Sequence, residues 1–273
     1  MRKRSALFLS IFSIVFLVFA LAGCSKTKAK SNEKKTVKVG VVGENNQVWK
    51  PIIKKFKKQG VTIKLVKFSD YIKPNTALAE GDIDLNAYQG YVLMDDYNKN
   101  HGNVLSAIGE TTLNPIGLYS KKAKSVKKIP ANSTIAIPND TVNAARALLL
   151  LQSAGLIKLK DVKTPGTGDI TSNPKNFKIK EVEASQTARV LPDVGASVIN
   201  VFMALDAGFN PTKQALYNEP VNAKSKPYYN IIVSRSKDKN NKLYKQIVAA
   251  YQSNTSKKII KKLYKGAVIP LWK

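Results

Sequence analysis

The stretch VKVGVVG at residues 37–43 decides the fold class of this chain. Its valines, closed by a glycine, are typical of a buried strand. A helix is expected at 49–56, and the alternating stretch VTIKLVKF at 61–68 predicts a second strand. A short helix at 74–80 and a strand at 83–88 complete a β-α-β-α-β order. This order predicts a parallel sheet with helices on its faces.

A comparable unit starts again near residue 133. The elements expected in it are strands at 133–137, 177–183 and 194–200 and helices at 141–154 and 201–208. Two connecting stretches, 118–130 and 218–227, separate the units, and after the second the chain has an apolar strand at 229–233 and two basic amphipathic helices. We therefore expect an α/β protein of two lobes, joined by paired crossings and separated by a ligand cleft. Lobe 1 is predicted at 37–122 with 227–273, and lobe 2 at 123–226.

The N-terminus resembles the export signal of a bacterial lipoprotein. Arg2, Lys3 and Arg4 precede an apolar run that is too short for a comfortable membrane span. The run closes on Leu21-Ala22-Gly23-Cys24, which is similar to a lipobox, whose cysteine is acylated. We predict a signal peptide at 1–23, a lipid anchor at Cys24 and a tether at 24–36, with the protein on the extracytoplasmic face of the cell membrane. The alternative is a signal peptide with an incidental cysteine.

The chain is strongly basic. Its formal charge is +27, and +24 remains once the three cations of the signal are removed (27 − 3). Such a charge raises nucleic acid as a partner. However, the lysines are spread through nearly every segment, without an arginine-rich stripe or an aromatic-basic module. This favours a lysine-coated exterior that faces an anionic cell envelope, and no nucleic acid partner is expected.

Residues suited to catalysis are scarce. The single histidine, His101, lies in the polar sequence NKNHGN, and a lone cysteine excludes disulfides and cysteine-rich metal sites from the mature domain. Asp82 and Asp84 alternate in GDIDLN, where a structural role is favoured over paired acid–base catalysis. No phosphate-binding glycine motif occurs in a strand-to-helix context. We therefore predict a protein that is not an enzyme and that has no cofactor or metal site.

Arg146 is the most informative charged residue. It lies in PNDTVNAARALLLLQ (138–152), a predicted helix that is otherwise almost purely apolar after its first turn. A guanidinium stays protonated, and burial without a partner would cost several kcal/mol. Its partner is therefore a ligand carboxylate or an acidic side chain of the protein. Asn143, one turn earlier, is expected on the same face.

Other polar and aromatic residues suit a small zwitterion. Asn200 ends the apolar strand GASVIN, and Asn230 lies inside PYYNII, so both amides are expected where strand ends meet a cleft. Tyr71 and Tyr88 are candidates for the walls of a side-chain pocket. Each of these signals is weak when it is taken alone.

Several blocks of sequence together resemble the NlpA family, the methionine-type substrate-binding lipoproteins of ABC importers. The blocks are the lipobox, FSDYIKPNTALAEGDIDLNAYQ (68–89), GLYSKK (117–122), IAIPNDTVNAARALLLLQSAGLI (135–157), DITSNPKNFKIKEVEASQ (169–186) and PYYNIIVSR (227–235). The resemblance implies a two-lobed periplasmic-binding-protein fold and no catalysis. It also implies an amino-acid ligand, delivered to a membrane permease that a separate ATPase subunit powers.

The resemblance also implies roles for individual residues. The family's carboxylate-binding arginine matches Arg146, its amides match Asn200 and Asn230, and its pocket aromatics match Tyr71 and Tyr88. Methionine is the ligand expected first.

Three departures from the family pattern leave the ligand open. The family's ligand-facing histidine is replaced by Gly90 in NAYQG (86–90), and its Gly-Asn-Tyr is replaced by Val201-Phe202-Met203. The family's histidine-containing loop after the first strand is replaced by ENNQ (44–47). The loss of a hydrogen-bonding ring predicts a wider and less polar wall, so another apolar amino acid or a short methionine-containing peptide stays open. A basic cell-surface adhesin is the alternative from another class of protein.

Overall fold

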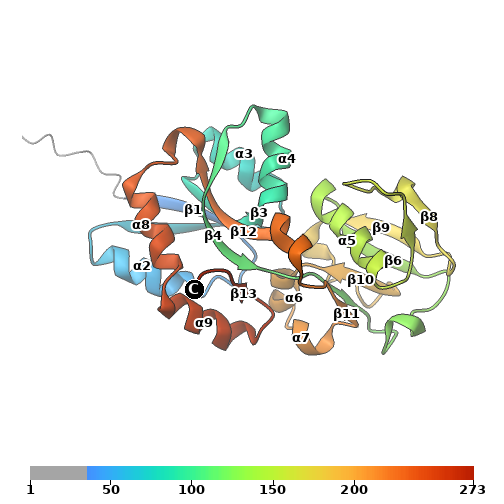
Figure 1. The fold of residues 1–273 in the computed structure, drawn as a ribbon. Helices are drawn as coiled ribbons and strands as arrows, with labels where there is room; N and C mark the ends of the chain where they lie inside the picture. The colour runs from blue at the N-terminus through green and yellow to red at the C-terminus, as the bar shows by residue number, and fades with distance from the viewer. Residues whose placement is uncertain (1–35) are drawn as a thin grey trace, which may run out of the picture. The chain divides into compact units, whose positions relative to one another are not determined.

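The structure is a computed structural model that describes residues 36–273 (Figure 1). The predicted signal peptide, Cys24 and all of the predicted tether except Thr36 lie outside the described residues. The described residues form one compact unit, and their four hydrophobic clusters lie within it. The described chain folds around two larger sheets, which correspond to the two expected units.

The first sheet has six strands in the order β13-β4-β12-β3-β1-β2. Their bounds are β1 Thr36–Val42, β2 Thr62–Phe68, β3 Leu85–Gly90, β4 Leu105–Leu113, β12 Tyr229–Arg235 and β13 Ile269–Pro270. Strand β1 is parallel to β2 and β3, as the β-α-β-α-β order predicts. Strand β12 is antiparallel to both β3 and β4 because it enters from the other end of the sheet. The part of the sheet built from the β-α-β-α-β order is therefore parallel as predicted, and β12 makes the whole sheet mixed.

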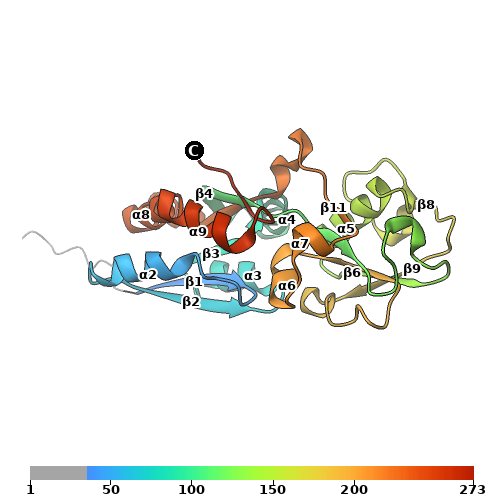
Figure 2. The ribbon, with the colours of Figure 1, turned by 90° about the horizontal axis from the view of Figure 1, so that it is seen from below.

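Helices cover both faces of this sheet. They are α2 (Trp49–Lys57), α3 (Lys73–Glu80), α4 (Tyr91–His101), α8 (Lys242–Tyr251) and α9 (Asn254–Tyr264). Neighbouring residues of β12 point to opposite faces. Ile232 packs in the cluster that contains α2, α8 and α9, whereas Ile231 and Val233 pack in the cluster that contains α3 and α4. Helices α2, α8 and α9 therefore share one face of the sheet (Figure 2). Within this layer the ring of Trp49 lies edge-on to that of Tyr251.

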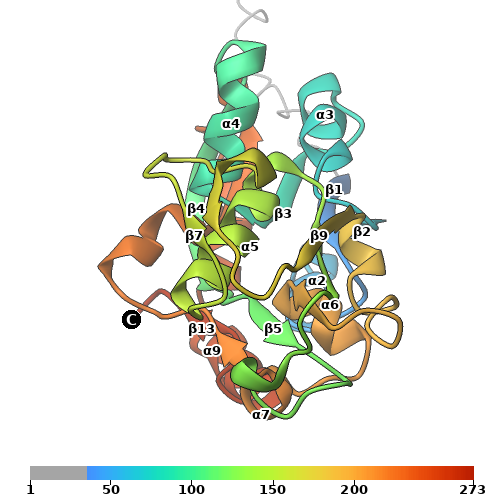
Figure 3. The same cartoon turned by 90° about the vertical axis from the view of Figure 1, so that its right-hand side faces the viewer.

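The second sheet has five strands in the order β11-β5-β10-β6-β9. Their bounds are β5 Gly117–Tyr119, β6 Thr134–Pro138, β9 Lys178–Val182, β10 Ala196–Ile199 and β11 Tyr217–Asn218. Helix α5 (Thr141–Ser153) lies beside this sheet (Figure 3). Its Ala147 and Leu148 belong to one hydrophobic cluster with Ile135 and Val198 of the sheet. The other elements of the chain between β5 and β12 are β7 Lys158–Leu159, β8 Ile170–Ser172, α6 Val201–Asp206 and α7 Pro211–Gln214, with short 3₁₀ segments between them.

The predicted boundary between lobes falls close to the boundary between sheets. Strand β5 pairs with β10 and β11 in the five-stranded sheet, although the prediction assigned residues up to 122 to lobe 1. The division into 37–122 with 227–273 and 123–226 stays a prediction, and the sheet pairing favours its first crossing just before Gly117. Within residues 36–273 no helix is both long and apolar enough to cross a membrane.

Candidate functional site

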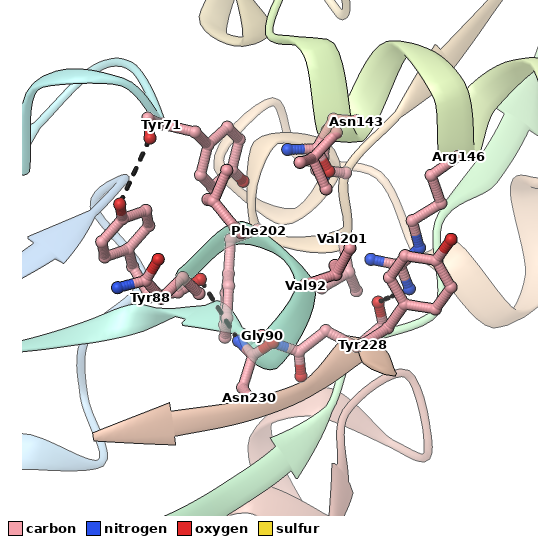
Figure 4. Close-up of a pocket in the computed structure, with 15 residues that line it drawn as sticks. Tyr71, Tyr88, Gly90, Val92, Asn143, Arg146, Val201, Phe202, Tyr228 and Asn230 are labelled. Carbon is pink, nitrogen blue, oxygen red and sulfur yellow. Dashed lines mark hydrogen bonds between the residues drawn. The ribbon is translucent and has the colours of Figure 1, made fainter. Parts of the chain in front are cut away.

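A small pocket lies where the two sheets meet (Figure 4). Its walls include all six residues predicted for the ligand site: Tyr71, Tyr88, Asn143, Arg146, Asn200 and Asn230. The other residues of the wall are Gln89, Gly90, Val92, Leu93, Asn114, Val142, Val201, Phe202 and Tyr228. The pocket therefore brings together the end of β3, the start of α4, the first turns of α5 and α6, and the entry to β12.

The start of α5 is held by a buried carboxylate. Asp140 caps the helix, and it accepts hydrogen bonds from the Asn143 backbone N–H at 2.9 Å and from Asn143 Nδ2 at 2.9 and 3.0 Å. Burial raises the pKa of the Asp140 carboxyl, and the hydrogen bonds from Asn143 oppose that rise. Asn143 Oδ1 in turn accepts from Asn200 Nδ2 at 2.9 Å. This chain of contacts fixes both amides at the pocket.

Arg146 meets an acidic side chain of the protein. Its Nε lies 2.8 Å from Glu219 Oε1, and its Nη2 lies 2.5 Å from Glu219 Oε2 and 3.1 Å from the Asn114 carbonyl oxygen. Its guanidinium carbon lies 4.2 Å from the centre of the Tyr228 ring. The structural ion pair that the sequence left open is therefore present. Within residues 36–273 the hydrogen bonds of Arg146 are made by Nε and Nη2, and Arg146 lines the pocket (Figure 4). A ligand carboxylate at Arg146 stays a prediction.

Two tyrosines form an aromatic wall on the side of the six-stranded sheet. The rings of Tyr71 and Tyr88 are stacked with centroids 5.9 Å apart, and Tyr88 Oη donates to the Tyr71 carbonyl oxygen at 3.2 Å. Burial raises the pKa of both phenols, so both stay neutral. Asn230 Nδ2 donates to the Tyr88 carbonyl oxygen at 3.3 Å, which places this amide beside the wall. The wall suits the apolar part of a ligand.

The pocket contains hydrogen-bond acceptors without partners. Asn114 Oδ1 and Asn200 Oδ1 are buried, and neither has a hydrogen-bond partner among the described residues. Buried polar atoms are nearly always satisfied in folded proteins, so an orphan acceptor in a pocket points to a donor from a ligand or from water. The pocket therefore combines a guanidinium, two free acceptors and an aromatic wall. Such a set can bind the carboxylate, the ammonium and the side chain of an amino acid.

Backbone atoms lie close to Gly90, and the expectation of a wider wall than in other family members stays a prediction. A Cβ built on Gly90 would lie 3.0 Å from the Pro227 carbonyl oxygen and 3.0 Å from backbone atoms of Tyr228. The backbone that leads into β12 therefore occupies the space where a side chain would begin. The wall is also apolar where the family pattern is polar, since Val201 and Phe202 line the pocket.

Sequence reasoning missed several residues of the site. Glu219 lies in a stretch that was predicted only as a crossing, and Asn114 and Tyr228 had no signal of their own. The need for an anionic partner at Arg146 was the one signal that could have led to Glu219. Acidic residues are few in this chain, but the sequence spacing does not indicate which of them pairs with Arg146.

The residues weighed for catalysis lie outside the pocket. His101 is exposed at the end of α4, where its ring stacks on Tyr97 and its Nδ1 lies 2.8 Å from the Tyr97 carbonyl oxygen. Asp84 is buried and accepts from the Lys38 backbone N–H at 2.8 Å, and Arg235 Nη2 lies 3.6 Å from it. Both arrangements are structural. Within residues 36–273 no group of three or more histidine, cysteine or acidic side chains is placed to hold a metal ion.

Two α/β lobes with a polar pocket where they meet define the class of two-lobed solute-binding proteins. The NlpA lipoprotein family profile matches residues 37–272. The chain is 42% identical to the D-methionine-binding lipoprotein MetQ of Salmonella typhi, over 93% of each chain. The chain therefore belongs to the NlpA lipoprotein family.

Solved structures agree with this assignment. A nutrient-binding protein of Burkholderia cenocepacia, bound to methionine, superposes with a TM-score of 0.80 at 42% identity, over 86% of this chain and 100% of that one. The substrate-binding protein of a methionine transporter from Streptococcus pneumoniae gives a TM-score of 0.82 at 40% identity, over 87% and 96% of the chains. These values show a shared two-lobed fold.

Proposed function

We propose that this chain is the extracytoplasmic solute-binding lipoprotein of an ABC importer and that it binds methionine. Its relatives include methionine-binding proteins at about 40% identity over nearly their whole length, which supports the ligand class. The protein delivers the amino acid to a membrane permease that a separate ATPase subunit powers, and it catalyses no reaction. An acylated Cys24 holds it at the outer face of the cell membrane.

The observation that carries the proposal is the set of polar groups in one pocket. Arg146 offers Nη1 to the ligand carboxylate, and the orphan oxygens of Asn114 and Asn200 accept from the ligand ammonium. The thioether side chain then lies against Tyr71 and Phe202. A sulfur near an aromatic ring gains about 0.3–1.5 kcal/mol, which favours methionine over an aliphatic side chain of equal length.

Binding of small molecules to the purified protein tests this function. The protein is denatured to release any ligand, refolded, and titrated by calorimetry with L-methionine, D-methionine, norleucine, leucine and a neutral sugar. We expect one site that binds a methionine enantiomer more tightly than norleucine and that does not bind the sugar. A ligand that binds the native state raises its stability by about 2.7 kcal/mol at a hundredfold excess over Kd, so thermal unfolding gives an independent measure. No response to any amino acid would contradict the proposal.

A methionine-containing dipeptide is a second candidate. A groove lined by Tyr91, Asp95, Lys163 and Pro227, among others, lies beside the pocket, and Val92 and Val142 belong to the walls of both. A ligand longer than one residue can extend into this groove. Titration with glycyl-methionine and methionyl-glycine separates the candidates, because a dipeptide ligand must bind more tightly than the free amino acid.

A further inference from the structure

The lysines of the helical layer gather on one face. Helices α2, α8 and α9 contain no acidic residue. We call "the basic face" the exposed lysines of these helices and of their C-terminal caps: Lys50, Lys54, Lys55, Lys57, Lys58, Lys242, Lys245, Lys258, Lys261, Lys262 and Lys265. Among the described residues, none of these ammonium groups has a carboxylate within ion-pair distance. The face therefore offers unneutralised positive charge to solvent.

The opposite face of the same sheet has a different charge. Helices α3 and α4 contain the lysines Lys73 and Lys99 but also the acidic residues Glu80, Asp95 and Asp96. A general coat of lysine for solubility would charge both layers alike. Here the cations of the six-stranded lobe are concentrated on the α2, α8 and α9 layer, so the lobe is electrostatically two-sided.

The predicted tether enters the fold beside the basic face. Thr36, the first described residue, pairs with Thr62 of β2, which the chain reaches directly from the last turn of α2. The end of β12 lies at the same edge of the sheet, because Ser234 pairs with Leu85, and α8 begins shortly after it. From Cys24 to Thr36 the chain can span at most about 40 Å. An anchor at Cys24 thus keeps this edge of the lobe close to the membrane.

We infer that the basic face docks on the surface of an anionic lipid bilayer. Basic residues close to such a surface are each attracted by about fivefold in partition, and the attraction falls off within about 10 Å at 0.1 M salt. The face has the complementary charge, it is free of internal ion pairs, and the end of α2 and the start of α8 lie at the edge where the anchored chain arrives. Docking holds the α2, α8 and α9 layer toward the lipid. The face lies apart from the pocket, so the inference does not depend on the ligand.

Vesicle binding of the chain from Ser25 onward tests this docking, because that chain keeps the whole compact unit and lacks the anchor. Flotation is measured with vesicles of phosphatidylcholine alone and with vesicles containing 30% phosphatidylglycerol, in 20 mM and 500 mM NaCl. We expect binding only to the anionic vesicles at low salt. Replacement of Lys54, Lys58, Lys258 and Lys262 by Gln should weaken it by about tenfold or more.

Two control variants keep the test specific. Replacement of Lys121, Lys124, Lys178 and Lys180 by Gln removes the same charge from exposed lysines of the other lobe, and it should change binding by less than about twofold. Replacement of the four basic-face lysines by Arg should retain binding, which also shows that the positions tolerate substitution. Equal losses in both Gln variants, or no binding to anionic vesicles, would overturn the inference. Tighter binding to a soluble polyglycerol phosphate than to vesicles would assign the face to a polymer instead.

Discussion

Arg146 and Glu219, 73 residues apart in the chain, face each other edge to edge, with Nε and Nη2 of the guanidinium on the two carboxylate oxygens. Helix α5 supplies the arginine, and the stretch that leads from β11 back to β12 supplies the glutamate. The arginine side chain is 8% exposed and the glutamate side chain 17%. The pair therefore ties the pocket wall to a segment that connects the lobes.

Removal of the Glu219 carboxylate should destabilise the protein without weakening the binding of the ligand. Glu219→Gln keeps an oxygen acceptor but leaves the Arg146 charge without its counter-ion, so we expect the free energy of unfolding to fall by about 1.5–3 kcal/mol. Methionine affinity should stay equal or rise, because Glu219 then no longer neutralises the Arg146 charge that attracts a ligand carboxylate. Urea denaturation and calorimetry measure the two effects. Glu44→Gln is the control, since the ion pair of Glu44 with Lys67 is exposed and should contribute less than 1 kcal/mol.

Removal of the guanidinium should affect both stability and binding. Arg146→Ala leaves Glu219 unpaired and should lower the free energy of unfolding by about 3 kcal/mol. If Nη1 binds the ligand carboxylate, methionine binding should weaken by about 2–5 kcal/mol as well. Arg189→Ala, at an exposed position, controls for loss of a cation. Full affinity in a destabilised Arg146→Ala protein would make Arg146 purely structural.

A side chain at position 90 should be poorly tolerated. In Gly90→Ala the new Cβ meets the backbone of Pro227 and Tyr228 at 3.0 Å, so α4 or the entry to β12 has to shift. We expect a loss of about 1–3 kcal/mol in stability. Gly168→Ala is the matched control, because a Cβ there meets no atom within 4 Å. Thermal unfolding compares the two, and equal stability would show that the wall at Gly90 is open.

The Asp140 carboxyl should leave a signature in the pH dependence of stability. Its folded-state pKa is raised by burial above the ordinary 3.8, so the folded protein holds this proton at pH values where the unfolded chain has lost it. The contribution of Asp140 to stability is therefore fully present below pH 3.8 and is lost as pH rises through the folded-state pKa.

Asp140→Asn removes this proton and keeps an N-cap acceptor. The stability of the variant relative to the wild type should therefore increase as pH rises from about 3.8 and then level off above the folded-state pKa of Asp140. Denaturation at a series of pH values from 3.5 to 7 measures this. Asp96→Asn, at an exposed position on α4, corrects for the change in net charge. A difference that falls with pH would contradict the assignment.

The strongly patterned part of the chain was predictable. Strands β1 and β2 and helix α5 lie within a residue or two of the expected ranges, because valine runs and a leucine-rich helix carry their periodicity locally. Helix α4 and strand β4 were not predicted. The sequence YVLMDDYNKNH of α4 mixes apolar and polar residues without a clear stripe, and LSAIGETTL of β4 has no strict alternation. Both are fixed by packing against residues that are distant in the chain.

The candidate site also has a part that local sequence could predict and a part that it could not. The six predicted residues line the pocket because their positions at helix starts and strand ends follow from the local pattern, although their roles toward a ligand stay predictions. Glu219 could not be found locally, since its pairing with Arg146 spans 73 residues. The space beside Gly90 is taken by backbone atoms of Pro227 and Tyr228, which are distant from it in the sequence. The absence of a side chain at residue 90 therefore could not predict which atoms lie there.

The position of β12 sets an order of events in folding. Strand β4 has only β12 and β13 as neighbours in its sheet, and both belong to the last part of the chain, from Tyr229 onward. The strands of the five-stranded sheet follow one another in the sequence, with no strand of the other sheet between them, so this sheet can form before Tyr229 is available. Strand β4 still lacks a paired strand on both sides at that stage. During N-to-C emergence the unfinished six-stranded lobe is thus the aggregation-prone species, and loss of the C-terminal strands leaves it without a central strand.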